Sequence, residues 1–229
     1  MITVAMVYRS GGDFAGDYVV RLADQIDRHL NSRCWTVCLT DRPSPAIERA
    51  VDEVKLLEHN WPGWWAKLEL FGLDGPVLYL DLDTIVRANI EQLAAAVESL
   101  LPGDVMMLRG FYRPIACSGI LGWNGSLRWL LDRFAQRESL HPKTMRGVER
   151  AAQFAVRLGL TNDQEYVADA LLRSGKYRIV YAQDLFPGIY SYKVHIRPAL
   201  SLPTDAAVIC FHGRPRPHEV DTAALEVCL

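Results

Sequence analysis

Two aspartates that follow an apolar run have the clearest chemical potential in this chain. Asp81 and Asp83 come after the residues VLYL at positions 77–80, and the spacing predicts a strand over residues 77–86. A strand buried on both faces tolerates a carboxylate only where the carboxylate has a partner. Side chains two apart share a face, roughly 7 Å apart along the strand, so both carboxylates are expected to point the same way, with Leu82 in the core. Two carboxylates that converge in this way predict a binding site for Mg²⁺ or Mn²⁺. The alternative is a strand that ends in a turn with two solvated aspartates.

The elements that must position these carboxylates alternate along the chain. Apolar, β-prone runs predict strands, and apolar residues at helical spacing predict helices. The predicted strands are 2–8, 34–39, 77–86, 104–108, 118–123, 177–182 and 207–211, and the predicted helices are 17–30, 64–71, 90–101, 127–136 and 163–174. Such alternation indicates an α/β fold with a mostly parallel central sheet flanked by helices. Arg9 and Asp41 also follow strands, so one crevice at the carboxyl ends of the strands is expected to collect them.

Composition narrows the class of protein. Half of the 229 residues are apolar, and the net charge is −2 without a long basic run, which argues against nucleic acid as a partner. No apolar stretch approaches ~18 residues and no basic leader precedes the first strand, so we expect a cytoplasmic protein without a transmembrane segment. Five cysteines without a C-x-x-C pair indicate reduced thiols. No repeat or linker divides the chain, so residues 1–229 are predicted to form one domain.

Six short motifs stand in order over most of the chain. They are the strand and loop at 4–12 with LTD at 39–41, WWAKLELF at 64–71, DLD at 81–83, SGILGWN at 118–124, NDQ at 162–164, and FHGRPRP at 211–217. Together they resemble the GT-A nucleotide-sugar glycosyltransferases, particularly glycosyltransferase family 8 and its bacterial relatives. The resemblance implies a Rossmann-like GT-A domain and a metal-dependent, retaining transfer of a sugar from a UDP-sugar to a glycan, lipid or protein acceptor. Cys117, Arg216 and His218 depart from the family pattern, in which Asn or Asp, Lys, and Trp are usual.

The resemblance also implies the residues that bind the donor and the metal. The loop after the first strand and the end of the second would cradle the nucleotide, through Val7, Tyr8, Arg9, Ser10 and Asp41. His212 would join Asp81 and Asp83 as a ligand of Mn²⁺ or Mg²⁺. Gly213 would let the backbone approach closely, and Arg216 would clamp the diphosphate. Negative charge grows on the leaving diphosphate during transfer, and a divalent ion with a nearby cation is suited to stabilise it.

Several other residues have both a functional and a structural interpretation. Lys67 would contact a phosphate or the donor, although a lysine on a helix is commonly solvated. Asp163 is either the N-cap of a helix or, with Gln164, a catalytic residue on the sugar side of the site. At least two of the tryptophans at 61, 64 and 65 are expected to pack, while one could stack a base or sugar ring. Residues 186–198 are interpreted as a loop that could close over the donor.

Two other functions share parts of this pattern. A haloacid-dehalogenase-type phosphatase also has an apolar strand followed by D-x-D. In that class a Thr or Val stands two residues after the second Asp, whereas here Thr84 follows at once and Ile85 takes the diagnostic position. The second alternative is a GT-A fold retained as a non-catalytic module that binds nucleotide sugars. The intact Asp81, Asp83 and His212 argue against it.

Overall fold

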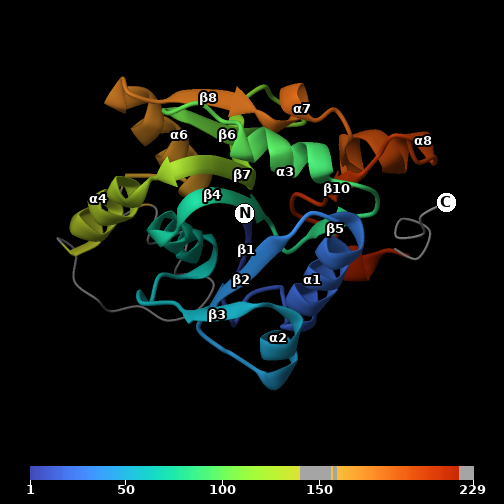
Figure 1. Cartoon of the computed structure of the whole chain (residues 1–229), viewed down its shortest axis with the longest axis horizontal. Helices are drawn as coiled ribbons and strands as arrows, with labels where there is room; N and C mark the ends of the chain where they lie inside the picture. The colour runs from blue at the N-terminus through green and yellow to red at the C-terminus, as the bar shows by residue number, and fades with distance from the viewer. Residues whose placement is uncertain (140–155, 157–158, 222–229) are drawn as a thin grey trace.

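The computed structural model describes residues 1–139, 156 and 159–221, and its centre is a seven-stranded sheet (Figure 1). Across the sheet the strands are β3 (Glu53–Leu56), β2 (Cys34–Thr40), β1 (Ile2–Tyr8), β4 (Asp74–Leu80), β7 (Ala116–Ser126), β6 (Asp104–Arg109) and β8 (Arg178–Tyr181). Strands β3, β2, β1 and β4 pair in parallel, β7 is antiparallel to both of its neighbours, and β8 is parallel to β6. The predicted α/β class with a mostly parallel sheet is therefore confirmed.

The register of the parallel strands brings their carboxyl ends to one edge. Tyr8 at the end of β1 is paired with Thr40 at the end of β2, so Arg9 and Asp41 both continue from that edge. Strand β4 runs in the same direction beside β1, and its last residue, Leu80, is followed at once by Asp81. The three loops that carry candidate site residues thus begin at the same edge of the sheet.

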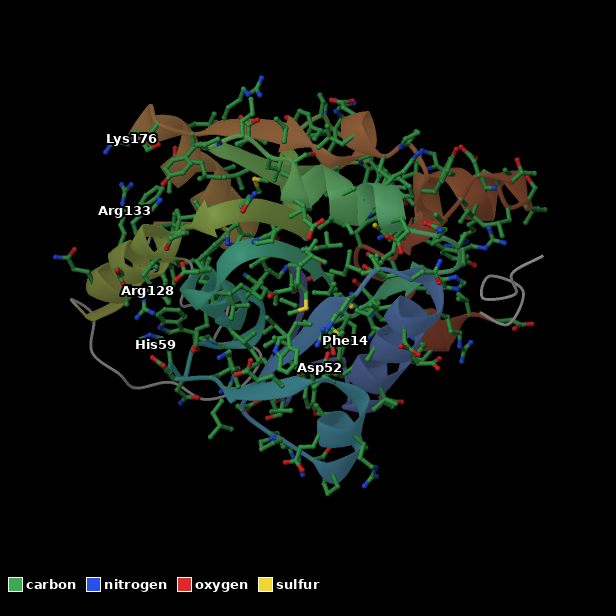
Figure 2. All side chains as sticks on the ribbon, viewed as in Figure 1. Phe14, Asp52, His59, Arg128, Arg133 and Lys176 are labelled. Carbon is green, nitrogen blue, oxygen red and sulfur yellow. The ribbon has the colours of Figure 1, made fainter. Side chains whose placement is uncertain are left out.

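Helices cover both faces of the sheet. One face packs against α1 (Asp17–His29), α2 (Pro45–Ala50), α3 (Glu91–Glu98) and α7 (Ala182–Leu185). The other packs against the 3₁₀ helix η1 (Gly63–Gly72), α4 (Arg128–Ser139) and α6 (Asp163–Ser174). The period-two pattern of the strands divides the core: Val4 and Met6 on β1 face the first set, while Ala5 faces the second. Figure 2 shows side chains filling both layers, with Arg133 and Lys176 at the periphery.

Local sequence explains where the helices begin and end. Helix α1 buries an apolar stripe made by Val19, Leu22 and Ile26, which is the 3.6-residue pattern of an amphipathic helix. Helix α6 begins after Asn162, whose side chain accepts a hydrogen bond from the backbone N–H of Glu165 at 2.9 Å. It ends at Ser174 and is followed by Gly175, which has φ of 64°, a left-handed conformation that glycine adopts without strain. Asn162, and not Asp163, is therefore the cap of α6.

A second, three-stranded sheet brings the C-terminal part of the chain to the D-x-D segment. Its strands are β5 (Thr84–Val86), β10 (Val208–Cys210) and β9 (Ile189–Ser191), with β10 in the middle. Short helical segments η2 (Tyr192–Ile196), α8 (Arg197–Ala199) and η3 (Pro217–Glu219) belong to this region. Just beyond β10, the N–H of Phe211 donates to the carbonyl of Asp83 at 3.2 Å. The chain therefore leaves β10 beside Asp83, and the segment that follows brings Arg216 onto that carboxylate.

Two expectations from the sequence are corrected by this architecture. The run 77–86 is not one strand: β4 ends at Leu80, and the N–H of Thr84 donates to the carbonyl of Asp81 at 3.0 Å to close a turn. The chain then enters β5, which pairs with β10 in the other sheet. Residues 186–198 are not a loop, because β9 pairs with β10 and the helical segment η2 follows it. Within the residues that the structure describes, no helix is both long and apolar enough to cross a membrane.

Candidate active site

The D-x-D turn places its three side chains in different surroundings. Leu82 is buried in the core, as expected, and its carbonyl accepts a hydrogen bond from the guanidinium of Arg21 at 3.2 Å. The side chain of Asp81 is 32% exposed, whereas that of Asp83 is only 8% exposed. A turn, not a strand, thus presents both carboxylates at the edge of the sheet. Each of them has a cationic partner on another element of the structure.

Lys67 is the partner of Asp81. Its Nζ lies 2.8 Å from Oδ1 of Asp81 and 3.4 Å from Oδ2 of Asp163, and it donates to the hydroxyl of Ser118 at 3.1 Å. The hydroxyl of Ser118 in turn donates to Asp163 at 2.6 Å, and the hydroxyl of Tyr79 donates to Asp81. The side chain of Lys67 is only 11% exposed. Lys67 is thus not the solvated helical lysine of the alternative interpretation, and Asp163 belongs to a buried network that reaches the D-x-D turn.

The charge balance of this network keeps Lys67 protonated. Burial by itself lowers the pKa of Lys67, but the nearby carboxylates of Asp163 and Asp81 more than offset burial and raise this pKa above its ordinary value. For Asp83, in contrast, the surroundings disfavour the charged form. Burial and the negative charge of Asp81 raise the pKa of Asp83 to about 7, although the guanidinium of Arg216 works against that increase. The pair of aspartates therefore favours an additional positive charge beside it.

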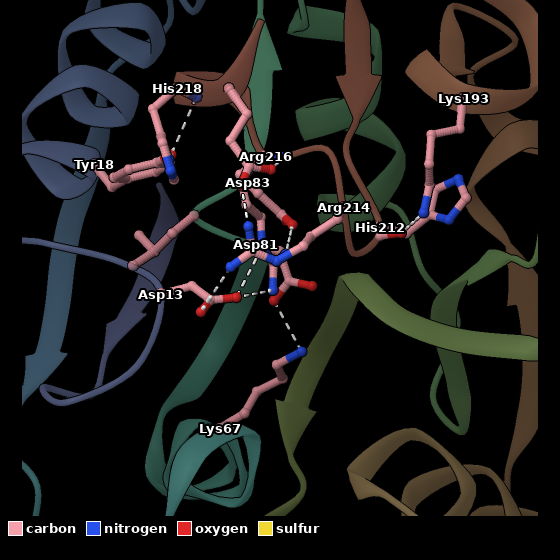
Figure 3. Close-up of polar contacts among 12 residues, drawn as sticks. Asp13, Tyr18, Lys67, Asp81, Asp83, Lys193, His212, Arg214, Arg216 and His218 are labelled. Atoms are coloured by element: carbon pink, nitrogen blue, oxygen red, sulfur yellow. Dashed lines mark hydrogen bonds and ion pairs between the residues drawn. The ribbon is translucent and has the colours of Figure 1, made fainter. Parts of the chain in front are cut away.

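Arg216 is the partner of Asp83. Its guanidinium donates to Oδ2 of Asp83 and also contacts Oδ2 of Asp13 at 3.1 Å, as Figure 3 shows. The guanidinium also lies over the ring of Phe14, 4.7 Å from the ring centroid. Arg214, which is 67% exposed, pairs instead with Glu219 and more distantly with Asp13. Of these two arginines, Arg216 is the one directed at the aspartates.

A cavity of about 410 Å³ lies at the carboxyl edge of the sheet beside the two aspartates. Residues predicted for the donor or metal that line it are Val7, Arg9, Ser10, Lys67, Asp81, Asp83 and Arg216. Asp13, Phe14, Trp64 and Tyr79 line it as well and were not assigned to the site from the sequence, apart from the stacking role left open for the tryptophans. Tyr79 could have been found from spacing, since it stands two residues before Asp81 in the same apolar run. No comparable signal marks Asp13.

The nucleotide-binding residues predicted from the loop after β1 take different positions. Asp41 accepts hydrogen bonds from the backbone N–H of Ser10 at 2.7 Å and from the hydroxyl of Ser10 at 2.6 Å, and it pairs with Arg9. Arg9 also donates to the carbonyl of Trp61 at 3.1 Å. Tyr8 is buried in the core. Asp41 therefore holds this loop in place through Arg9 and Ser10 without lining the cavity itself, while Val7, Arg9 and Ser10 do line it.

The three tryptophans divide between packing and the cavity. Trp61 and Trp65 are buried, and each ring contacts Phe134, with centroid distances of 4.8 and 5.2 Å. Trp64 is 41% exposed and lines the cavity. The expectation that at least two of them pack is confirmed. The indole of Trp64 is the one available to stack on a ligand ring.

His212 does not contact the two aspartates in this structure. Its Nε2 lies 2.6 Å from the hydroxyl of Ser191, and its ring stacks on Phe111 with 5.3 Å between centroids. Figure 3 shows His212 beside Lys193 and apart from Asp81 and Asp83. Burial and the neighbouring charge of Lys193 lower the pKa of His212 to about 4, so the imidazole is neutral at pH 7. Its role as a metal ligand stays a prediction that requires the side chain to rotate.

Two further predicted residues flank this region. Gly213 has φ of 85°, a left-handed conformation that residues with a side chain rarely adopt, so a larger residue is disfavoured there. Gln164 is half-buried in the first turn of α6, directly after the Asp163 that joins the Lys67 network. Its predicted contact with the donor sugar stays a prediction.

The residues that could hold a divalent cation are Asp81 and Asp83. Among the residues that the structure describes, no group of three or more His, Cys, Asp or Glu side chains is arranged as a metal site. Carboxylate oxygens are nonetheless the ligands that Mg²⁺ and Mn²⁺ prefer, and such ions take water and substrate phosphates as their remaining ligands. Burial of Asp83 beside a second carboxylate also favours a bound cation. The chemistry of the two side chains therefore fits a hard divalent ion.

Comparison with known proteins identifies the fold. No protein-family model and no curated protein sequence matches the chain. Among solved structures, the galactosyltransferase LgtC in complex with donor and acceptor sugar analogues is 13% identical with a TM-score of 0.57, over 94% of this chain and 88% of LgtC. A second LgtC structure, of an active-site mutant, is 13% identical with a TM-score of 0.59, over 96% and 91% of the two chains.

A longer structure is similar as well. The apo form of the glycosyltransferase GlyE from Streptococcus pneumoniae TIGR4 is 13% identical with a TM-score of 0.56 over 94% of this chain. The present chain spans 55% of the length of GlyE. Likeness at this level of identity concerns architecture, and it agrees with the seven-stranded sheet and its helical layers. The chain has the GT-A fold of these glycosyltransferases.

Proposed function

We propose that this protein is a glycosyltransferase that moves a sugar from a nucleoside diphosphate sugar, specifically a UDP-sugar, to a glycan, lipid or protein acceptor. One observation carries the proposal: the Asp81–Asp83 turn, Lys67 and Arg216 line one cavity at the carboxyl edge of a GT-A sheet. Such a cavity combines ligands for a divalent ion with cations for a diphosphate. The solved structure of LgtC with donor and acceptor sugar analogues supports the same class of reaction for this fold.

The residues of the chain can perform distinct parts of the transfer. Bond cleavage leaves negative charge on the diphosphate, and Arg216 at the cavity wall is suited to neutralise part of it. Asp81 and Asp83 would hold Mn²⁺ or Mg²⁺, which acts as a Lewis acid toward phosphate oxygens when bound. Lys67 holds the carboxylate of Asp81 in place through its 2.8 Å contact. We assign Asp163 and Gln164 to the sugar side, because the Lys67 network connects Asp163 to the D-x-D turn.

The fold bears on the alternatives. The phosphatase interpretation rested on the apolar strand followed by D-x-D, whereas the similar structures named above are glycosyltransferases. A non-catalytic module that binds nucleotide sugars would use the same cavity. Turnover, and not binding, distinguishes such a module from an enzyme.

The test is a panel of nucleotide sugars measured by thermal shift with and without Mn²⁺, followed by an assay for slow donor hydrolysis. A ligand that binds the native state alone raises the melting temperature. We expect a UDP-sugar and Mn²⁺ together to raise it more than either alone, and we expect released UDP. Equal shifts with UMP, which lacks the diphosphate, contradict the proposal. Binding without any hydrolysis or transfer supports the non-catalytic module, and phosphate release from simple phosphomonoesters supports the phosphatase.

A further inference from the structure

The guanidinium of Arg216 is held between two carboxylates that come from different loops. Asp83, 133 residues away in sequence, belongs to the D-x-D turn, and Asp13, 203 residues away, belongs to the loop after β1. The Asp13 contact is made through two nitrogens, Nη2 at 3.1 Å and Nε at 3.3 Å. The ring of Phe14 covers the guanidinium at 4.7 Å. Arg216 is thereby fixed on one side by Asp13 and Phe14 and on the other by Asp83.

The contact with Asp83 has a consequence for metal binding. Oδ2 of Asp83 accepts the hydrogen bond from Arg216, and the same carboxylate is the one that a divalent ion would use. A guanidinium and a divalent ion in contact with one small, 8% exposed carboxylate would repel each other strongly, because screening by water is weak there. The two cations therefore compete for Asp83. Asp81 has an analogous partner in Lys67, but Lys67 is anchored by Asp163 and Ser118 as well.

We propose that Arg216 acts as a built-in counter-ion that keeps Asp83 from binding a divalent cation until a diphosphate arrives. This inference rests on the proposed function. When the diphosphate enters, it offers Arg216 new oxygen partners, so Arg216 turns from Asp83 to the diphosphate and the metal takes its place. Asp13 is the positioning residue that keeps Arg216 at the cavity during the exchange, because its contacts do not involve Asp83.

The exchange predicts an order of binding. Metal alone binds weakly, since it must displace Arg216 without compensation. Diphosphate and metal bind cooperatively, since each relieves the cost that the other faces, and the coupling is reciprocal. An arginine that merely clamps the diphosphate would strengthen nucleotide binding without suppressing binding of metal alone. The affinity for metal in the absence of nucleotide is therefore the discriminating quantity.

The experiment measures Mn²⁺ binding to the full chain by the electron paramagnetic resonance signal of free Mn²⁺, with and without UDP. Arg216→Met should bind Mn²⁺ alone about tenfold more tightly than the wild type, which lies within the usual range for coupled sites. Arg216→Gln should behave in the same way, which covers the case that the methionine variant does not fold. Arg216→Lys retains the charge and should stay close to the wild type.

Two controls make the effect specific. Arg214→Met removes the same charge two residues away, from a side chain that is 67% exposed and paired with Glu219, and should leave the affinity for Mn²⁺ alone unchanged. Adding Asp83→Asn to Arg216→Met should abolish the gain, because the newly available carboxylate is gone. Asp13→Asn should weaken UDP binding in the presence of Mn²⁺ while the affinity for Mn²⁺ alone rises or stays constant.

The outcomes separate this inference from the proposed function. If the wild type binds UDP with Mn²⁺ but neutral variants at 216 bind Mn²⁺ no more tightly than Arg214→Met does, the exchange is wrong and the proposed function stands. A gain that survives Asp83→Asn also overturns the exchange. If the wild type binds neither UDP nor a UDP-sugar at any Mn²⁺ concentration, the proposed function fails, and this inference fails with it.

Discussion

Nζ of Lys67 lies 2.8 Å from Oδ1 of Asp81, and this buried contact ties the 3₁₀ helix η1 to the D-x-D turn. The same ammonium is 3.4 Å from Asp163 at the start of α6. One cation therefore connects η1, the D-x-D turn and, about 80 residues further along the chain, the start of α6. Its removal would leave the buried carboxylate of Asp163 and the partly exposed carboxylate of Asp81 without their shared partner.

Lys67→Met is accordingly expected to destabilise the protein by about 3–5 kcal/mol, the range for breaking one side of a buried ion pair. Urea unfolding followed by circular dichroism measures the change. The matched control is Lys55→Met, since Lys55 pairs with Glu53 at 2.7 Å but both side chains are well exposed. That control should cost about 0–1 kcal/mol. Equal losses for the two variants would show that the Lys67 network contributes no more than a surface pair.

Trp64 is expected to stack on the base of the donor, because it is exposed and lines the cavity. Trp64→Ala should weaken UDP binding by about 1–3 kcal/mol, the range for stacking a base on an aromatic side chain. Isothermal titration in the presence of Mn²⁺ measures the affinity. Trp35, on β2, is 39% exposed against 41% for Trp64, which makes Trp35→Ala a control of matched exposure. UDP affinity that is unaffected by Trp64→Ala would remove the indole from the nucleotide site.

Gln164 follows Asp163 on α6 and is proposed to act at the reacting centre. Gln164→Ala should leave UDP affinity within a few-fold of the wild type while donor hydrolysis or transfer falls by about 10²-fold, a loss of roughly 2.7 kcal/mol in the transition state. The two measurements are made on the same preparation, so folding is controlled internally. A parallel fall in affinity and turnover would instead place Gln164 in ground-state binding.

His212 must leave Ser191 if it is to serve as a metal ligand, because its Nε2 lies 2.6 Å from the Ser191 hydroxyl. His212→Ala should therefore raise the Mn²⁺ concentration needed for half of the thermal shift given by UDP. Ser191→Ala frees the imidazole and should lower that concentration or leave it unchanged. An Mn²⁺ requirement that is the same in His212→Ala and the wild type would exclude this histidine from the metal shell.

Asp83 should make stability depend on pH near neutrality. Burial and the charge of Asp81 raise its pKa from the ordinary 3.8 to about 7, so folding favours the protonated carboxyl. That stabilising contribution is complete below pH 3.8 and is lost as the pH rises through about 7. Asp83→Asn does not ionise, so its melting temperature relative to the wild type should be higher at pH 8 than at pH 5.5. A difference that is constant between these pH values would show that Asp83 is not the group responsible.

Much of the framework is determined by local sequence. Apolar runs indicated the strands of the main sheet apart from β3, and helix α6 begins at Asp163 as predicted, because period and capping residues act over a few neighbours. The apolar residues before Asp81 also predicted a buried strand leading into D-x-D and Leu82 in the core, although the strand ends at Leu80 and not at residue 86. These features depend on short-range geometry, so the order of residues is sufficient to derive them.

The tertiary structure decided which charges meet. Strand β5 leaves the main sheet after the turn at residues 81–84, and β10, more than 120 residues later in the chain, pairs with it in the second sheet. Asp13 carries no motif, yet the loop after β1 and the C-terminal segment place it on Arg216. His212 lies in the motif that implies a metal ligand, but its side chain forms a hydrogen bond with Ser191 in the structure. Long-range strand pairing and the choice among nearby hydrogen-bond partners depend on the whole packed chain. The spacing of residues within a short segment therefore does not predict them.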